Sequence, residues 1–215
     1  MGVIRYKIWQ DLWSNKTRTF QVVLIIAVGA FAIGMIIATR NYVVEAMHQS
    51  WIESSPAMIG MWNWPRVSDA DIRALEKIDG VVDVEGYAVD SVEWRLDAGQ
   101  DWQPGSVTVR SDYDDQQFHK ITLVDGSWPQ KKELVVGQGT DTVFGAEIGK
   151  QIILKTNGRE KVFDIVGNVS DPIAQPPGFG GNAQFFVSRE TFEELFGTED
   201  YNRIFASAVE YDEDA

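Results

Sequence analysis

The longest apolar stretch of the chain runs from Phe20 to Thr39. It reads FQVVLIIAVGAFAIGMIIAT and contains no charged residue. Twenty helical residues rise about 30 Å, which matches the hydrocarbon core of a bilayer. The alternative, a buried helix of a soluble protein, rarely runs this long without a charge. The pattern therefore predicts a transmembrane helix at residues 20–39.

The residues before this stretch have a helical pattern of their own. Ile4, Ile8 and Leu12 recur every four residues, and Trp9 and Trp13 flank the stripe that they form. Tryptophan rings settle at the level of the lipid headgroups, beside a membrane span. The sequence therefore predicts an amphipathic helix at the membrane interface over residues 1–19, although an ordinary soluble helix has the same periodicity.

The residues after the span continue the helical pattern. Residues 40–55 read RNYVVEAMHQSWIESS, and Pro56 follows them. Proline disfavours the α conformation in the residue before it, so a helix tends to end there. We therefore expect a stalk helix over residues 40–56, leading out of the membrane.

A cleaved signal peptide is the main alternative for the N-terminal region. The apolar part of a signal peptide covers only about 7–15 residues and ends in a small-residue cleavage site. The motif Ala30-Phe31-Ala32 fits such a site, but it lies in the middle of the apolar run. The length of the run and its long basic flank favour an uncleaved span.

The remainder of the chain alternates between strand and helix patterns. Helices are predicted over 68–78 and 189–196, with Ser68 and Ser188 as N-caps. The predicted strands share period-2 alternation or short apolar runs between turn residues: 81–96, 106–110, 121–124, 133–137, 151–155, 162–166, 183–187 and 204–209. The segment AMIGMWNWP at 57–65 reads as a buried strand, with an exposed partner-binding patch as the alternative.

These patterns predict an α+β fold behind the N-terminal amphipathic and transmembrane helices. Strands and helices alternate at both ends of the remaining chain, whereas its middle is rich in strands. We therefore expect an extracytoplasmic, membrane-proximal α/β subdomain formed by 57–111 and 182–215. A β-rich subdomain, 112–181, is expected to be inserted into it.

Charge and composition narrow the class of protein. The formal net charge is −13, but residues 1–19 carry +3 and the chain after Arg40 carries −17. A basic flank before a span predicts a cytoplasmic N-terminus and an outer main domain in the inner or plasma membrane. The acidic domain is not expected to bind nucleic acid. The sequence contains no cysteine, which excludes disulfides, thiolate metal sites and cysteine catalysis.

We find no pattern that predicts an enzyme, a metal site or a cofactor site. The only histidines, His48 and His119, have no partner at catalytic or ligand spacing, and exposed structural positions are expected for both. The motif Gly145-x-x-x-Gly149-Lys150-Gln151 lacks the spacing and hydroxyl residue of a phosphate loop. The acidic turn at 112–115 lacks the glycine and distal glutamate of a calcium loop.

One face of the predicted span carries small residues. Ala30, Gly34 and Ala38 are spaced by four residues and would lie along one side of a helix. Small residues at this spacing allow another membrane helix to approach closely. We expect this face to pack against a further helix.

The start of the chain resembles the N-terminus of MacB-type ABC transporter permeases, the group that includes FtsX and LolC/LolE. These begin with an interfacial helix, a short basic turn and an apolar helix. Asn15, Lys16 and Arg18 match that turn. The segments Asp125–Pro129, Glu133–Gly137, Phe144–Lys150 and Phe163–Val169 resemble, in order, the extracytoplasmic core domain of the same family.

The resemblance implies a non-catalytic permease with four spans, of which this chain is the first part. A separate or fused ATPase would hydrolyse ATP, and the span and stalk would transmit motion to the outer domain. The implied partners are an ABC ATPase subunit, a second permease subunit, membrane lipid and an extracytoplasmic protein. The loop with Pro176, Pro177, Gly178 and Phe179 becomes a candidate partner-contact loop.

Two other hypotheses remain open from the sequence. One is a single-span, membrane-anchored extracytoplasmic sensor or binding protein. The other is a secreted enzyme behind an uncleaved signal. Three further apolar spans downstream of residue 215 would favour the permease over both.

Overall fold

The computed structural model describes residues 2–175 and 177–209, and the chain divides into two compact units, Met1–Gln49 and Ser50–Ala215. We call them the N-terminal unit and the C-terminal unit. Their elements, in chain order, are α1 (Gly2–Ser14), α2 (Lys16–Glu53), β1 (Ile59–Val67), α3 (Asp69–Leu75), β2 (Val81–Arg95), β3 (Gln103–Arg110), β4 (Thr122–Gly126), β5 (Glu133–Gly137), α4 (Thr140–Phe144), β6 (Gln151–Thr156), β7 (Arg159–Ser170), the 3₁₀ turn η1 (Pro177–Phe179), β8 (Ala183–Phe186), α5 (Arg189–Phe196) and β9 (Tyr201–Ala208).

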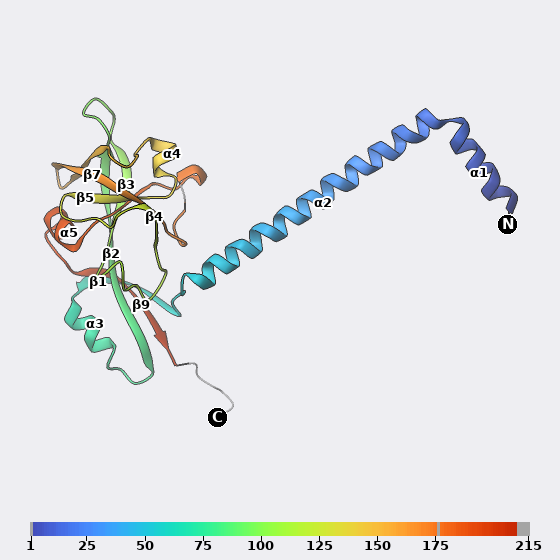
Figure 1. Ribbon diagram of the computed structural model, residues 1–215. Coiled ribbons are helices and arrows are strands. Elements are labelled where there is room, and N and C mark those ends of the chain that lie inside the picture. The colour runs from blue at the N-terminus through green and yellow to red at the C-terminus, as the bar shows by residue number, and fades with distance from the viewer. Residues whose placement is uncertain (1, 176, 210–215) are drawn as a thin grey trace. The chain divides into compact units, whose positions relative to one another are not determined.

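The N-terminal unit consists of α1 and most of α2 (Figure 1). Helix α2 has 38 residues, and none of them is buried within the chain. Among the described residues it is the one helix long and apolar enough to cross a bilayer. The predicted apolar helix at 20–39 is therefore confirmed, and the same helix continues without a break through most of the predicted stalk.

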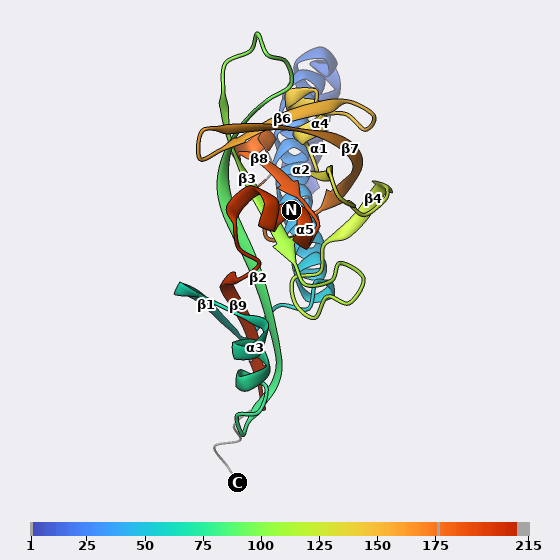
Figure 2. The same ribbon diagram turned by 90° about the vertical axis from the view of Figure 1, so that its left-hand side faces the viewer.

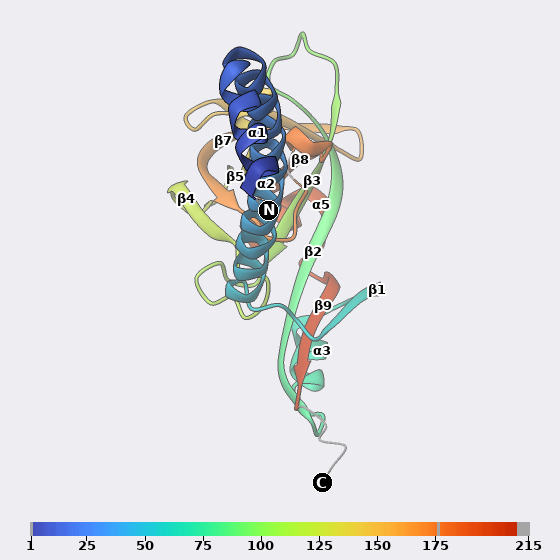
Figure 3. The ribbon, with the colours of Figure 1, turned by 90° about the vertical axis from the view of Figure 1, so that its right-hand side faces the viewer.

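In the described C-terminal unit, nine strands form one sheet in the order β1-β9-β2-β3-β8-β5-β7-β4. Strand β6 pairs with both β2 and β7, so the path β2-β3-β8-β5-β7-β6 closes on itself. Strand β2 runs the length of this unit, from α3 to the loop before β3 (Figure 3). Its first half pairs with β9, and its end pairs with β6.

The main hydrophobic core fills the closed part of the sheet. Trp94 is 1% exposed and meets the rings of Phe144 and Phe185 edge-on, with centroids 5.3 and 5.6 Å away. Its indole Nε1–H donates to the carbonyl of Pro104 at 3.2 Å, which satisfies the one polar atom of the side chain. Burying a side chain of this size contributes several kcal/mol to folding, so Trp94 fixes how β2 and β3 face α4 and β8.

A second, smaller layer lies at the other end of β2. Figure 2 shows α3 beside β1, β9 and the first half of β2. Ser68 caps α3: its hydroxyl accepts from Asp71 N, and the Asp71 carboxylate accepts from Ser68 N at 2.8 Å. The predicted caps at Ser68 and Ser188 are both confirmed, but α3 ends at Leu75, three residues before the predicted end.

For the segment 57–65, the predicted strand is present, but its predicted burial is wrong. The segment does form a strand, β1, which lies at the edge of the sheet and pairs only with β9 among the described strands. An edge strand has one neighbour rather than two, so Met58, Met61 and Trp62 remain exposed, the last at 77%. The alternative of an exposed patch describes this segment better.

The observed architecture confirms the predicted α+β fold class, with N-terminal helices followed by a mixed α/β domain. Strands β4 to β7 come from the segment 112–181, and they join the same sheet as the strands on either side of it. The division into a membrane-proximal subdomain and an inserted subdomain stays a prediction.

Candidate functional site

The last residues of α2, from Ser50 on, belong to the C-terminal unit, where the chain just after them is bonded to a loop. Two backbone N–H groups of the β3–β4 loop (residues 111–121) donate to the two residues that follow α2: Lys120 N to Ser54 O at 2.9 Å, and His119 N to Ser55 O at 3.1 Å. These bonds satisfy two carbonyls just beyond the end of the helix. We call this set of contacts the stalk junction.

A buried ion pair holds the loop side of the stalk junction. Arg110 Nη1 lies 2.7 Å from Glu85 Oε1, and both side chains are almost completely buried. Glu85 Oε2 accepts from the N–H groups of Gln117 and Phe118, at 3.0 and 2.9 Å. Arg110 donates to the carbonyls of Phe118 and His119, at 2.9 and 3.0 Å. Side chains of β2 and β3 therefore hold the β3–β4 loop in place, and that loop is bonded to the chain just after α2.

His119 occupies the centre of the stalk junction, contrary to the expected exposed position. The side chain is 5% exposed, because its ring lies between Trp51, at 5.2 Å between centroids, and Phe205, at 4.5 Å. Burial, and secondarily the charge of Arg110, lower the pKa of His119 below its usual 6.5. The imidazole is therefore neutral at neutral pH and serves as a packing group.

The predicted helix-packing face and basic turn both lie in the N-terminal unit. Ala30, Gly34 and Ala38 are exposed along one side of α2, and a Cβ added at Gly34 would meet no atom within 4 Å. Asn15 separates α1 from α2. Lys16 begins α2 with its Nζ 4.8 Å from the ring of Trp13, and Arg18 lines the cleft between the two helices.

The candidate partner-contact loop lies between β7 and β8. Pro176 falls outside the described residues. Pro177, Gly178 and Phe179 form η1, in which Pro177 is buried and Gly178 is exposed. Pro177 Cδ packs close to Gly139, at the start of α4, so this turn is braced by the main body of the unit. The role of these residues stays a prediction.

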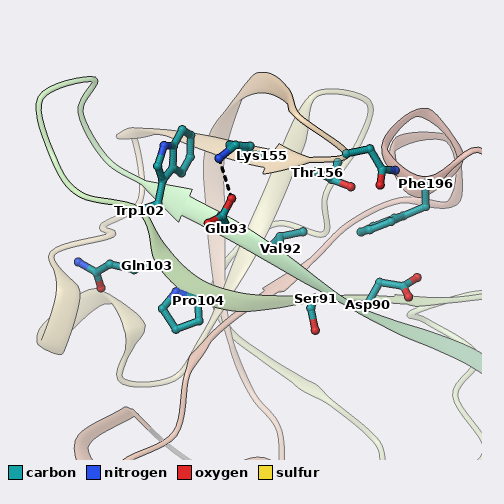
Figure 4. Close-up of a pocket in the computed structure, with 11 residues that line it drawn as sticks. Asp90, Ser91, Val92, Glu93, Trp102, Gln103, Pro104, Lys155, Thr156 and Phe196 are labelled. Atoms are coloured by element: carbon teal, nitrogen blue, oxygen red, sulfur yellow. Dashed lines mark ion pairs between the residues drawn. The ribbon is translucent and has the colours of Figure 1, made fainter.

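A cavity of about 720 Å³ in the C-terminal unit is an open groove near the β2–β3 hairpin. Figure 4 shows Trp102 and Lys155 at one end of it and Asp90 and Phe196 at the other. The Trp102 ring is held between Arg95, at 4.1 Å, and Lys155, at 4.9 Å, and Lys155 also pairs with Glu93 at 2.8 Å. The groove presents a fixed aromatic ring among charges of both signs, and such a surface suits contact with another chain.

The described residues show no cluster of three or more histidine, cysteine or acidic side chains placed to hold a metal ion. The features that stand out are an apolar helix long enough to span a membrane and an α+β domain that follows it. They indicate a membrane-anchored protein with a separately folded domain.

Comparison with known proteins identifies the family. Residues 19–214 match the family described as the MacB-like periplasmic core domain, so the chain belongs to this family. The predicted relationship to MacB-like ABC transporter permeases is confirmed. No curated protein gives a significant match to the sequence.

Two solved structures are similar to part of this chain at low sequence identity. The extracellular domain of the noncanonic ABC-type transporter YknZ from Gram-positive bacteria is 19% identical, with a TM-score of 0.48 over 69% of this chain and 76% of that one. The periplasmic region of MacB from Actinobacillus actinomycetemcomitans is 14% identical, with a TM-score of 0.45 over 72% of this chain and 69% of that one.

The stalk junction was not anticipated from the sequence. Glu85 is one of several charged residues in its strand, and Arg110 ends a strand that also contains polar residues, so the sequence contains no clear signal for this pair. Nothing in the sequence shows that the two face each other, because that follows from the antiparallel pairing in which Tyr87 lies opposite Arg110.

Proposed function

We propose that this chain provides the first span and the outer domain of an ABC transporter permease. ATP hydrolysis by a separate nucleotide-binding subunit or domain drives export or mechanical work outside the membrane, and α2 carries the motion. The observation that carries this proposal is the family match over residues 19–214, which includes both the apolar helix and the domain beyond the stalk junction.

The charge distribution supports an orientation. The segment before the span carries +3, and the chain after Arg40 carries −17. Because basic residues next to a span favour the cytoplasmic side, α1 lies on the cytoplasmic surface, where it can contact the ATPase. The C-terminal unit then lies outside.

The stalk junction supports transmission rather than simple anchoring. A flexible linker between helix and domain would absorb any movement of the span. Here the two residues directly after α2 are bonded to a loop that is itself fixed by the Glu85–Arg110 pair. A shift of α2 is therefore passed to β2 and β3, which lie at the centre of the sheet order.

A second permease subunit packs against the small-residue face of α2 in this proposal. Replacing Gly34 with leucine is expected to weaken co-assembly about tenfold, because the side chain keeps the partner helix at a distance. The matched control is Gly29→Leu, about 140° away around the helix and equally free of neighbours within the chain. The measurement is cross-linked dimer yield and coupled ATPase activity of the complete permease.

The two variants separate the proposal from a general effect of leucine. Loss of assembly or coupling in Gly34→Leu alone supports the predicted face. Equal behaviour of the two variants would count against it, and normal assembly and coupling in both would remove the face from the proposal.

A further inference from the structure

A second, smaller cavity lies on the outer face of the sheet, away from the groove of Figure 4. Its volume is about 240 Å³. Strands β2, β3, β8 and β9 form its floor, and the start of the β7–β8 loop forms its wall. The residues used below are Arg110, Arg203, Asp171, Ser106, Thr108 and Gln184, all of which line it.

Arg203 gives this cavity a cation without a carboxylate partner. Within the described part of the chain, Arg66, Arg95, Arg110 and Arg189 all form ion pairs, and Arg203 forms none. Its guanidinium instead lies 5.8 Å from the ring of Tyr87. The other arginines without an ion pair whose side chains the structure describes are Arg18, Arg40, Arg73 and Arg159; all four are exposed, whereas Arg203 is half-buried.

Arg110 brings an unused donor to the same cavity. Its two terminal nitrogens are bonded to Glu85 and to the β3–β4 loop. Its Nε–H is buried and has no hydrogen-bond partner among the described residues, although the side chain is almost fully enclosed. A buried donor without an acceptor costs about 1–3 kcal/mol. Because Arg110 lines the cavity, a small shift of its side chain would bring this N–H to an acceptor placed there and recover the loss.

The other polar groups of the cavity favour an acceptor ligand as well. Ser106 and Thr108 offer hydroxyls, and Gln184 offers an amide. Asp171 is the cavity's own carboxyl group, but its Oδ1 accepts from Ile173 N at 3.0 Å in its own loop. Burial raises the pKa of Asp171, and the charge of Arg110 partly opposes that rise.

An apolar surface lies next to Arg203. The ring of Trp62, 77% exposed on the edge strand β1, is 5.3 Å from the Arg203 guanidinium. Arginine paired with an exposed tryptophan is a combination enriched at binding hot spots. A ligand that places its charge on Arg203 can lay an apolar body against this ring.

We propose that this cavity binds a carboxylate group carried on a small apolar body. The carboxylate accepts hydrogen bonds from Arg203 and from the free Nε–H of Arg110, and the apolar body meets Trp62. Such a group occurs on a free organic acid and at the end of a polypeptide chain. The proposal is independent of the coupling of α2 to ATP hydrolysis.

Ligand-observed NMR titration of the full chain in detergent micelles tests the proposal. The probes are benzoate, as the free acid, and N-acetylphenylalanine, as the chain end, each compared with its uncharged amide. We expect the acids to bind and the amides to bind at least tenfold more weakly, because charge-assisted hydrogen bonds to arginine are lost. The acid that binds more tightly indicates whether the carboxylate belongs to a free organic acid or to the end of a polypeptide chain.

The variant Arg203→Gln is expected to weaken binding of the acids about tenfold or more. Its control, Arg159→Gln, makes the same charge change at an exposed position outside the cavity and should leave binding unchanged. Because Arg203→Gln also removes ring contacts, Ala174→Leu serves as a second variant that fills the cavity without altering charge, and it should also abolish binding. The proposal is overturned if neither acid binds, if acids and amides bind equally, or if both cavity variants bind like the unmodified chain.

Discussion

Replacing Arg110 with methionine is expected to lower the free energy of unfolding by about 3–5 kcal/mol, since the substitution leaves Glu85 buried without its counter-ion. The Glu85 and Arg110 side chains are 4% and 2% exposed, so water cannot replace the lost partner. Urea unfolding of the full chain in micelles, followed by tryptophan fluorescence, measures the difference. Hydrogen exchange should also quicken at residues 117–120, because their bonds to the pair are lost.

The matched control is Lys155→Met, which removes the cation of the surface pair with Glu93. That pair is 28% and 55% exposed, and such pairs contribute about 0–1 kcal/mol. The double variant Glu85→Gln/Arg110→Met should recover part of the lost stability, because no charge stays buried. Equal losses for Arg110→Met and Lys155→Met would contradict the assignment of the pair as the fixed point of the stalk junction.

Gly126→Ala is the second substitution with a large expected effect, about 3 kcal/mol or more. Gly126 has a φ of +85°, and a Cβ added there would lie 2.1 Å from the carbonyl oxygen of Val166. The neighbour is backbone of the paired strand β7 and cannot turn aside as a side chain could. Both the left-handed conformation and the close approach therefore require glycine at this position.

Gly158→Ala separates these two causes. Gly158 also has a positive φ, +76°, but no atom lies within 4 Å of an added Cβ. We expect the Gly158→Ala substitution to lower the free energy of unfolding by about 1–2 kcal/mol, which is the conformational penalty alone. Thermal or urea unfolding of both variants gives the comparison, and a Gly126→Ala variant no less stable than Gly158→Ala would show that β4 does not approach β7 this closely.

Elements with strong local signals were predicted well from the sequence. Strand β5, at Glu133–Gly137, and helix α5, at Arg189–Phe196, have the predicted bounds. The apolar run of β5 lies between turn residues, and α5 begins after a serine cap and ends at Gly197 with a φ of +76°. In both cases the residues that set the ends lie within the element or directly beside it.

Features that depend on pairing between distant segments were not predictable. Strand β1 is apolar enough for a core strand, and only its position at the edge of the sheet leaves Trp62 exposed. His119 has a polar sequence neighbourhood, yet Trp51 and Phe205, 68 and 86 residues away in the chain, enclose its ring. The predicted packing face at Ala30, Gly34 and Ala38 requires a partner helix, so it stays a prediction.

We expect ATP-driven movement of α2 to reach the C-terminal unit. The distance between spin labels in two permease copies, reconstituted with the ATPase in nanodiscs, measures this movement. The chain has no cysteine, so Gly99→Cys places one label in this segment, at an exposed position of the β2–β3 loop that is free of neighbours. The account predicts that the distance distribution shifts when ATP binds and returns after hydrolysis. A distribution that stays unchanged while ATP is hydrolysed would contradict it.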